Sequence, residues 1–371
     1  MSIVNAQVGD VCLFSPEEPG LRSGSRIHIQ GVRTKLPVAD LVSSIWCPKA
    51  ISTMRSPVPF LLTLLIIPAF FACQSRSGSD QGGNAERVAR FAEGPGQLDD
   101  YWYQGEAEIS SYHLRQNRYR GVHPGEAVLI FVTEDFLTEE QVKNERYTNP
   151  NSTSVLKLNM IRRFTTGIYD YSIMTSVFTP VDTKEYPYTL KVTNSSQDWC
   201  GQSFMQINQE RKRYLVRTFS YFEEEGDQSD RTPAEPLEDE LFNRVRMNPD
   251  GLPTGSFTMY PSTTYCRLNH LPFSPQKVEA ALRDYEGENF ERPGLREYHV
   301  DFPEIGRKLS IVFEAEAPYR IAGWTEAYPS LLDGLERKTI AKRKKTLKTP
   351  YWKQNQRKDM VWRDSLELEG R

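Results

Sequence analysis

The 371-residue sequence lacks the short motifs that identify the common enzyme classes. It contains no G-x-S-x-G, no H-E-x-x-H and neither of the glycine-rich nucleotide-binding motifs, G-x-x-x-x-G-K-[ST] and G-x-G-x-x-G. No C-x-x-C pair or histidine-rich spacing indicates zinc. From the sequence we therefore assign no catalytic residue, no metal site and no cofactor.

The sequence also lacks a strong excess of charge, with 46 basic and 49 acidic residues. Residues 73–371 hold 40 basic and 45 acidic residues, a net charge of −5. This balance excludes a general attraction to nucleic acid, so any basic contact surface must be local.

No apolar run is long enough for an ordinary transmembrane helix. The longest extends over 15 residues, from Val58 to Ala72, is interrupted by Pro59 and Pro68, and falls short of the roughly 20 residues that a bilayer requires. Arg55 precedes this run, and Phe70-Phe71-Ala72-Cys73 follows the pattern of a lipobox, with a small residue before the cysteine. Residues 54–72 are thus predicted to be a lipoprotein signal peptide, with Cys73 acylated by a chain such as palmitate; a transmembrane helix is the alternative.

A signal peptide normally begins a chain, yet residues 1–53 precede this one. They contain Cys12 and Cys47 but neither a transit-peptide composition nor a second export signal. We therefore expect Met54 to be the initiator and residues 1–53 to be upstream sequence, or else a disordered extension. Residues 73–96, rich in Ser, Gly, Gln and Asn, predict a flexible tether, with a short helix at 85–92.

Residues 97–371 are predicted to form a β-rich domain. Aromatic residues make up 11% of the sequence, and its 24 prolines favour a turn-rich β protein. Alternating apolar residues predict strands over 106–118, 127–133, 155–164, 168–179, 188–192, 203–208, 214–222, 256–260, 277–284, 296–302, 308–315, 319–327 and 338–347. So many hairpin-connected strands predict an all-β fold with one or two helices. A long antiparallel sheet should curve into a partial barrel or fold over as a sandwich.

Two helices are expected within this domain. Leu237, Leu241 and Val245 recur at helical spacing, with acidic residues in the first turn and basic residues in the last, so the pattern predicts a helix over 237–247. A capping-box pattern from Thr138 to Gln141 predicts a shorter one. Residues 277–284 suit either state, and the neighbouring hairpins favour a strand.

Cys200 and Cys266 are the only cysteines after Cys73. In an oxidising periplasm they could form a disulfide or remain separate thiols. Cys200 would be a nucleophile only if a histidine lay beside it. The acidic run Glu223 to Asp230 lacks the EF-hand spacing, which favours a solvated loop over a calcium site. Glu106 and Glu108 share one strand face, a placement typical of salt-bridge partners.

Basic residues crowd the expected strand from Arg337 to Lys348. Lys342, Arg343, Lys344 and Lys345 are candidates for contact with anionic lipid head groups, lipopolysaccharide or an acidic partner. The alternative is an edge strand that its lysines protect from aggregation.

Several segments together resemble a family of uncharacterised cell-envelope lipoproteins of Gram-negative bacteria, whose members often carry the label septum formation inhibitor Maf. The resemblance covers roughly residues 100–365. It rests on Tyr101-Trp102-Tyr103 with Gly105 to Glu108, Gly167-Ile168-Tyr169, Trp199-Cys200-Gly201, Ser220-Tyr221-Phe222, Asn248-Pro249 and Gly323-Trp324-Thr325-Glu326. Proteins for which that label was coined are cytoplasmic nucleotide pyrophosphatases with a Ser-x-Ser-Pro-Arg-Arg segment, which is absent here. The resemblance thus implies an envelope location and nothing catalytic.

These observations predict a lipoprotein anchored to a membrane of the cell envelope and facing the periplasm or the cell surface. We expect a non-enzymatic binding or structural module whose curved sheet holds an apolar ligand or docks an envelope partner. The alternative is an unfamiliar hydrolase that uses Cys200 or a Glu–His arrangement. No nucleic-acid partner is expected.

Overall fold

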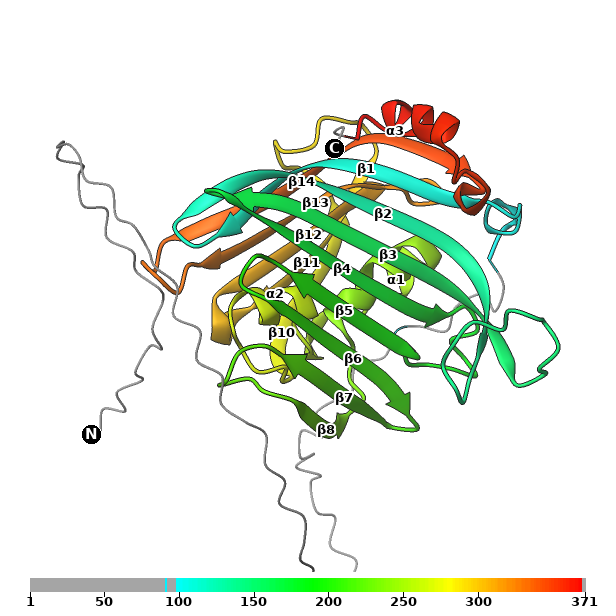
Figure 1. Cartoon of the computed structure of the whole chain (residues 1–371), viewed down its shortest axis with the longest axis horizontal. Helices are drawn as coiled ribbons and strands as arrows, with labels where there is room; N and C mark the ends of the chain where they lie inside the picture. Colours follow the sequence, from blue (N-terminus) through cyan, green and yellow to red (C-terminus); the bar gives the residue numbers. More distant parts are fainter. Residues whose placement is uncertain (1–90, 92–97, 369–371) are drawn as a thin grey trace, which may run out of the picture. The chain divides into compact units, whose positions relative to one another are not determined.

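A computed structural model describes residue 91 and residues 98–368, and a single 14-stranded antiparallel sheet dominates them (Figure 1). The order of strands across the sheet is β8-β7-β6-β5-β4-β3-β2-β1-β14-β13-β12-β11-β10-β9. The strands are β1 (Ala107–Arg118), β2 (Gly121–Leu137), β3 (Ser152–Thr166), β4 (Tyr169–Pro180), β5 (Lys191–Gln197), β6 (Gln202–Glu210), β7 (Arg213–Ser220), β8 (Gln228–Pro233), β9 (Gly255–Met259), β10 (Gln276–Asp284), β11 (Leu295–Phe302), β12 (Arg307–Glu314), β13 (Ile321–Pro329) and β14 (Glu336–Thr349). The predicted all-β fold is confirmed.

The first and last strands meet in the middle of the sheet. β1 pairs with β14 from Ala107↔Thr349 to Arg115↔Ile340, and β14 pairs on its other side with β13. The basic strand is therefore central, and the alternative that it is a protected edge is wrong. The edges are β8 and β9, and β8 is the strand that alternation did not predict.

The sheet has two rims, because neighbouring strands run in opposite directions. We call one the hairpin rim: it carries the β1–β2, β3–β4, β5–β6, β7–β8, β11–β12 and β13–β14 connections. The chain enters β1 at the opposite rim, after η1 (Asp100–Trp102), and the long β2–β3 loop lies there too. In Figure 1 the cyan β1–β2 hairpin and the orange β13–β14 hairpin project to the left.

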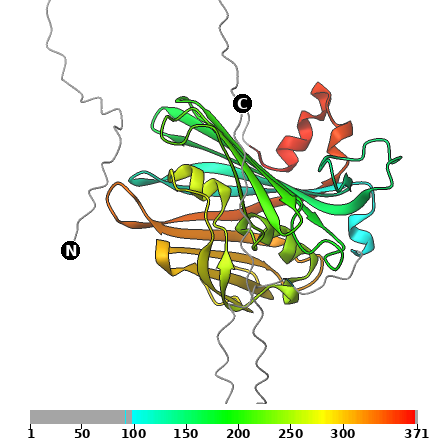
Figure 2. The ribbon, with the colours of Figure 1, turned by 90° about the horizontal axis from the view of Figure 1, so that it is seen from below.

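The chain on both sides of the edge strand β9 lies inside the curve of the sheet. We call residues 234–274 the inner segment; it contains η2 (Glu238–Glu240), α1 (Leu241–Met247), η3 (Pro249–Gly251), β9 and α2 (Thr263–Leu268). Figures 1 and 2 show α1 and α2 between the half of the sheet formed by β4–β8 and the half formed by β10–β13. The predicted helix over 237–247 is thus present as a 3-10 turn followed by α1.

The helix predicted at Thr138 is wrong, because residues 138–140 form a turn and Gln141 has a φ of +53°. The Gln141 side chain does not cap a helix; it donates a hydrogen bond to the Gln209 carbonyl at 2.7 Å. Residues 277–284 form a strand, as expected. No helix in the described part of the chain is both long and apolar enough to span a bilayer.

The end of the chain covers part of the outer face. We call residues 351–368 the C-terminal segment; it contains η5 (Tyr351–Lys353), η6 (Arg357–Met360) and α3 (Val361–Ser365). Leu366 packs with Ala107, Ile109 and Val132 on the outer side of β1 and β2. Figure 2 shows this segment in red, standing on the outer face of the sheet. Residues 1–72, Cys73, and the tether with its expected helix, apart from Phe91, lie outside the described residues.

Candidate functional site

The concave face of the sheet is the place where an apolar ligand was expected. Trp324 of β13 lies at its centre and is fully buried. Its ring packs 5.1 Å from Tyr112 of β1 and 5.4 Å from Phe242 of α1, measured between ring centroids. The inner segment and the two halves of the sheet share one continuous buried cluster. Side chains of the chain itself therefore occupy the space that a ligand would need.

Charged pairs fix α1 against this inner face. The Arg246 guanidinium donates two hydrogen bonds to Glu108 of β1, at 2.5 and 2.8 Å, and also lies over the rings of Trp102 and Phe131. Burial acts to raise the pKa of Glu108, but Arg246 outweighs it and holds the pKa below its usual range. Glu108 is thus half of a helix-to-sheet pair, and not the cross-strand partner that the sequence indicated.

A second buried network crosses the interior from η2 to the sheet. Arg307 of β12 binds Glu238 of η2 and lies 3.6 Å from Glu326, which also pairs with Arg162 of β3 at 2.8 Å. Asp239 accepts hydrogen bonds from the Ser262 hydroxyl and the Thr263 backbone NH. These are three carboxylates and two guanidinium groups, so the fully ionised network has one negative charge in excess.

Two of these carboxyl groups have a raised pKa, and for Asp239 burial outweighs the hydrogen bonds from Thr263 and Ser262. Burial raises the pKa of Glu238 to about 7, although Arg307 favours the ionised form. Burial also acts to raise the pKa of Glu326, but Arg162 and Arg307 together hold it below its usual range. Each carboxylate of this network has a partner within the chain, so the arrangement fastens the inner segment to the sheet and does not present an open acid–base pair.

The two cysteines lie in different surroundings. Cys200 is exposed at the β5–β6 turn, whereas Cys266 is buried in α2, and no disulfide joins them. The Asp198 carboxylate accepts hydrogen bonds from the backbone NH groups of Cys200 and Gly201, at 2.7 and 3.2 Å, which explains the tight turn. Burial raises the pKa of the Cys266 thiol well above its ordinary value, which keeps the thiol protonated and unreactive.

A Glu–His pair does exist, at the β7–β8 turn. His270 Nδ1 lies 2.7 Å from Glu225 Oε1, and Arg267 of α2 binds the same oxygen at 3.1 Å. Ser220 donates to the other oxygen of Glu225 at 2.5 Å. Burial would raise the pKa of Glu225, but these donors hold it below its usual value. The pair fastens the acidic turn to the end of α2.

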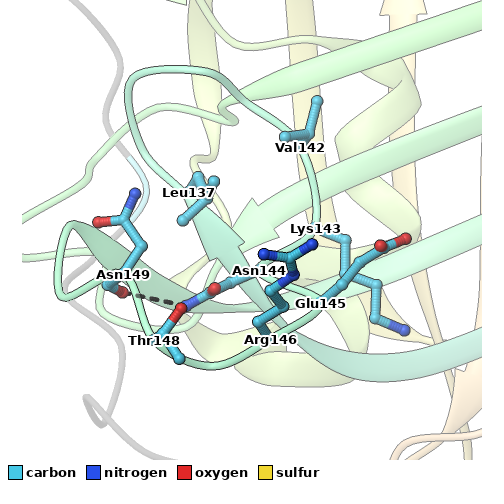
Figure 3. Close-up of a pocket in the computed structure, with 8 residues that line it drawn as sticks. All are labelled: Leu137, Val142, Lys143, Asn144, Glu145, Arg146, Thr148 and Asn149. Carbon is cyan, nitrogen blue, oxygen red and sulfur yellow. Dashed lines mark hydrogen bonds between the residues drawn. The ribbon is translucent and has the colours of Figure 1, made fainter.

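The acidic run from Glu223 to Asp230 is thus divided between this turn and the start of β8. Within residues 98–368, no three His, Cys, Asp or Glu side chains converge in a way that could hold a metal. The β2–β3 loop encloses a shallow hollow lined by Leu137, Val142, Lys143, Asn144, Glu145, Arg146, Thr148 and Asn149 (Figure 3). Asn144 crosses it to the Asn149 carbonyl at 3.0 Å, so the hollow is a feature of the loop's own folding.

The four basic residues of β14 do not share one free surface. Arg343 binds Glu314 of β12, and its side chain is only 6% exposed. Lys344 donates to the Glu367 carbonyl, and Lys345 pairs with the Glu367 carboxylate at 3.2 Å. Lys342 is exposed. The pairing of β1 with β14 is irregular at this point: Ser111 lies opposite Lys345 and Tyr112 opposite Arg343, so Lys344 has no partner residue on β1.

The hairpin rim presents several large apolar side chains to solvent. Ile168 is 82% exposed on the β3–β4 hairpin, Trp199 is 68% exposed on β5–β6, and Tyr221 is 70% exposed after β7. Leu331 and Leu335, on the β13–β14 hairpin, are 68% and 60% exposed. These side chains all project from one rim, and apolar surface exposed in this way is a candidate for binding another molecule.

A rigid base supports this rim. The Tyr119 hydroxyl lies 2.8 Å from the hydroxyls of both Tyr169 and Tyr171, which links the β1–β2 hairpin to β4. The Arg118 guanidinium lies 4.1 Å above the Tyr119 ring, and Trp199 packs against Tyr169. The sequence showed the turn residues of these hairpins. That the hairpins lie at the same rim follows only from the order of the strands in the sheet.

Comparison of the chain with protein-family models, with curated proteins and with solved structures finds no match.

Proposed function

We propose that this protein is a lipid-anchored, non-enzymatic binding module of the bacterial cell envelope that docks a protein partner at its hairpin rim. The lipobox pattern at Cys73 and the resemblance to envelope lipoproteins support the location. The exposed Ile, Trp, Tyr and Leu side chains on four connections of one rim carry the binding role.

We favour a protein partner over an apolar ligand because side chains of the protein itself fill the concave face of the sheet. A lipid chain would have to displace α1, which the Arg246–Glu108 pair and the Glu238–Arg307 pair hold in place. Breaking such a buried pair leaves an uncompensated charge in the core, at a cost of about 3–5 kcal/mol. The hydrolase alternative has no comparable support, because the Glu225–His270 pair serves to fasten a turn.

Photo-cross-linking in the envelope tests this proposal. A photoreactive amino acid at Ile168 or Leu331 should give a discrete protein adduct after irradiation, since both side chains project into solvent from the rim. The same amino acid at Lys184, exposed in the β4–β5 connection at the opposite rim, is the control. Absence of adducts at both rim positions, or equal adducts at Lys184, would contradict the proposal.

A further inference from the structure

The C-terminal segment exposes apolar and basic side chains together. Met360 and Val361 are each 57% exposed, and Trp352 and Trp362 are 45% and 40% exposed. Between and beside them lie Lys353, Arg357 and Lys358, all of them exposed. The segment is held to the sheet by its other side, where Leu366 and Leu368 pack on the outer face.

The charge of this region is opposite to that of the rest of the chain. Residues 336–368 contain eleven basic and four acidic residues, a net charge of +7 in a chain whose net charge is −3. The C-terminal segment lies beside β14: Lys344 and Lys345 both contact Glu367. Among the acidic residues of the C-terminal segment, Asp359 caps a turn within the segment: its carboxylate accepts a hydrogen bond from the Gln356 backbone NH at 3.0 Å.

We infer that the C-terminal segment is a peripheral membrane-binding surface for anionic phospholipid bilayers. Tryptophan is the side chain most typical of the interface between water and lipid, and Lys and Arg beside it are attracted to anionic head groups. The mixture of exposed apolar and basic residues fits a bilayer surface, whereas the hairpin rim carries its apolar residues beside the acidic β7–β8 turn. The inference rests on the proposed envelope location, but it does not need the lipid anchor.

The segment also replaces the contact surface that the sequence indicated. Arg343 and Lys345 have acidic partners within the chain. Lys353, Arg357 and Lys358 are exposed on the C-terminal segment. Lys342 and the other lysines of β14 add to the positive potential of this surface but do not themselves contact the bilayer.

Vesicle flotation of the full chain carrying Cys73→Ser tests the inference without any attached lipid. At low salt, binding to vesicles containing phosphatidylglycerol should exceed binding to pure phosphatidylcholine vesicles, and high salt should remove the excess. Any binding by the apolar run at 58–72 would occur on both kinds of vesicle. The readout is therefore the ratio of the two.

Replacing Lys353, Arg357 and Lys358 with Gln should lower this ratio about tenfold or more. The matched control replaces Arg211, Lys212 and Arg213, three exposed basic residues at the β6–β7 turn, with Gln and should leave the ratio nearly unchanged. Met360→Ser with Val361→Ser should weaken binding while the salt dependence stays. A wild-type ratio of one at low salt, or equal losses in the two charge variants, would overturn the inference. Either result leaves cross-linking at the hairpin rim as a separate test of the proposed function.

Discussion

Single residues in the interior carry an unusual amount of charge for a β protein. Glu238, Arg307, Glu326 and Arg162 are buried together, with the half-buried Asp239 beside them, and the charges of the five do not balance. An unbalanced buried charge is costly, so the protein relieves it by holding a proton. Glu238, with its pKa raised to about 7, is protonated in the folded state below neutral pH.

Glu238 should therefore make the stability of the protein fall as the pH rises. Between about pH 4.5 and about pH 7 the folded state keeps a proton that the unfolded state releases, so the free energy of unfolding decreases across this window. Glu238→Gln imitates the protonated form and should remove this contribution, on the order of 2 kcal/mol. Urea unfolding of both proteins at about pH 5 and about pH 8 measures the difference. Equal pH dependence in the two proteins would show that Glu238 is already ionised at the lower pH.

The sequence did not disclose these residues, because charged side chains in a strand or helix normally face water. Arg246 and Arg244 were interpreted as the basic last turn of a helix, yet both are buried and paired with carboxylates. The separation of Cys200 from Cys266 was likewise left open, since it depends on where α2 packs. Side-chain chemistry was visible in the sequence, but burial was not.

Among the elements, α1 has only seven residues and cannot be stable by itself. Every one of its side chains is buried, and Asn243 donates to the Leu156 carbonyl of β3 at 2.9 Å. The helix is therefore held by the sheet, through polar contacts as much as through apolar packing.

Removing one partner of the Arg246–Glu108 pair should destabilise the protein strongly. Arg246→Met leaves the Glu108 carboxylate buried without its main partner, and should lower the free energy of unfolding by about 3–5 kcal/mol. Adding Glu108→Gln to this variant removes the stranded charge and should restore a large part of the loss. Chemical denaturation of wild type, the two single variants and the double variant forms a complete cycle. If the losses of the single variants simply add in the double variant, the pair is not coupled.

Strand prediction succeeded wherever one face of the strand is apolar. Twelve of the fourteen strands were predicted at their observed places. The expected strand over 188–192 overlaps β5 only at Lys191 and Val192, because β5 carries a single apolar residue. β8, with the sequence Gln-Ser-Asp-Arg-Thr-Pro, was not predicted, since it has no apolar residue and is almost entirely exposed. It is a strand only because β7 offers backbone partners. The Thr138 helix failed for the opposite reason: the capping pattern was present, but no apolar helical face followed it.

At the largest scale, the sheet is a meander whose first and last strands pair at its centre. β1 and β14 are about 240 residues apart in sequence and lie side by side, while the edges β8 and β9 come from the middle of the chain. Tyr260 links the two edges, since its hydroxyl donates to the Pro233 carbonyl at 3.0 Å. Alternation could predict the strands and a curved sheet, but not the pairing of β1 with β14, because pairing between distant strands leaves no local pattern.

The central position of β14 predicts that two C-terminal truncations will behave very differently. A chain ending at Pro350 loses only the C-terminal segment. It uncovers Ile109 and Val132 on the outer face but keeps all fourteen strands, and should remain folded with a lower melting temperature. A chain ending at Ser330 loses β14, which leaves β1 and β13 as two unpaired edges and removes the link between the halves of the sheet.

Exposed long edges of this kind favour aggregation. The shorter chain should therefore fail to give a soluble β protein. Far-ultraviolet circular dichroism and size-exclusion chromatography of both truncated chains, beside the full chain, measure the outcome. A soluble, monomeric, strand-rich protein ending at Ser330 would mean that the two halves of the sheet fold independently, and that the pairing of β1 with β14 only docks one finished half on the other.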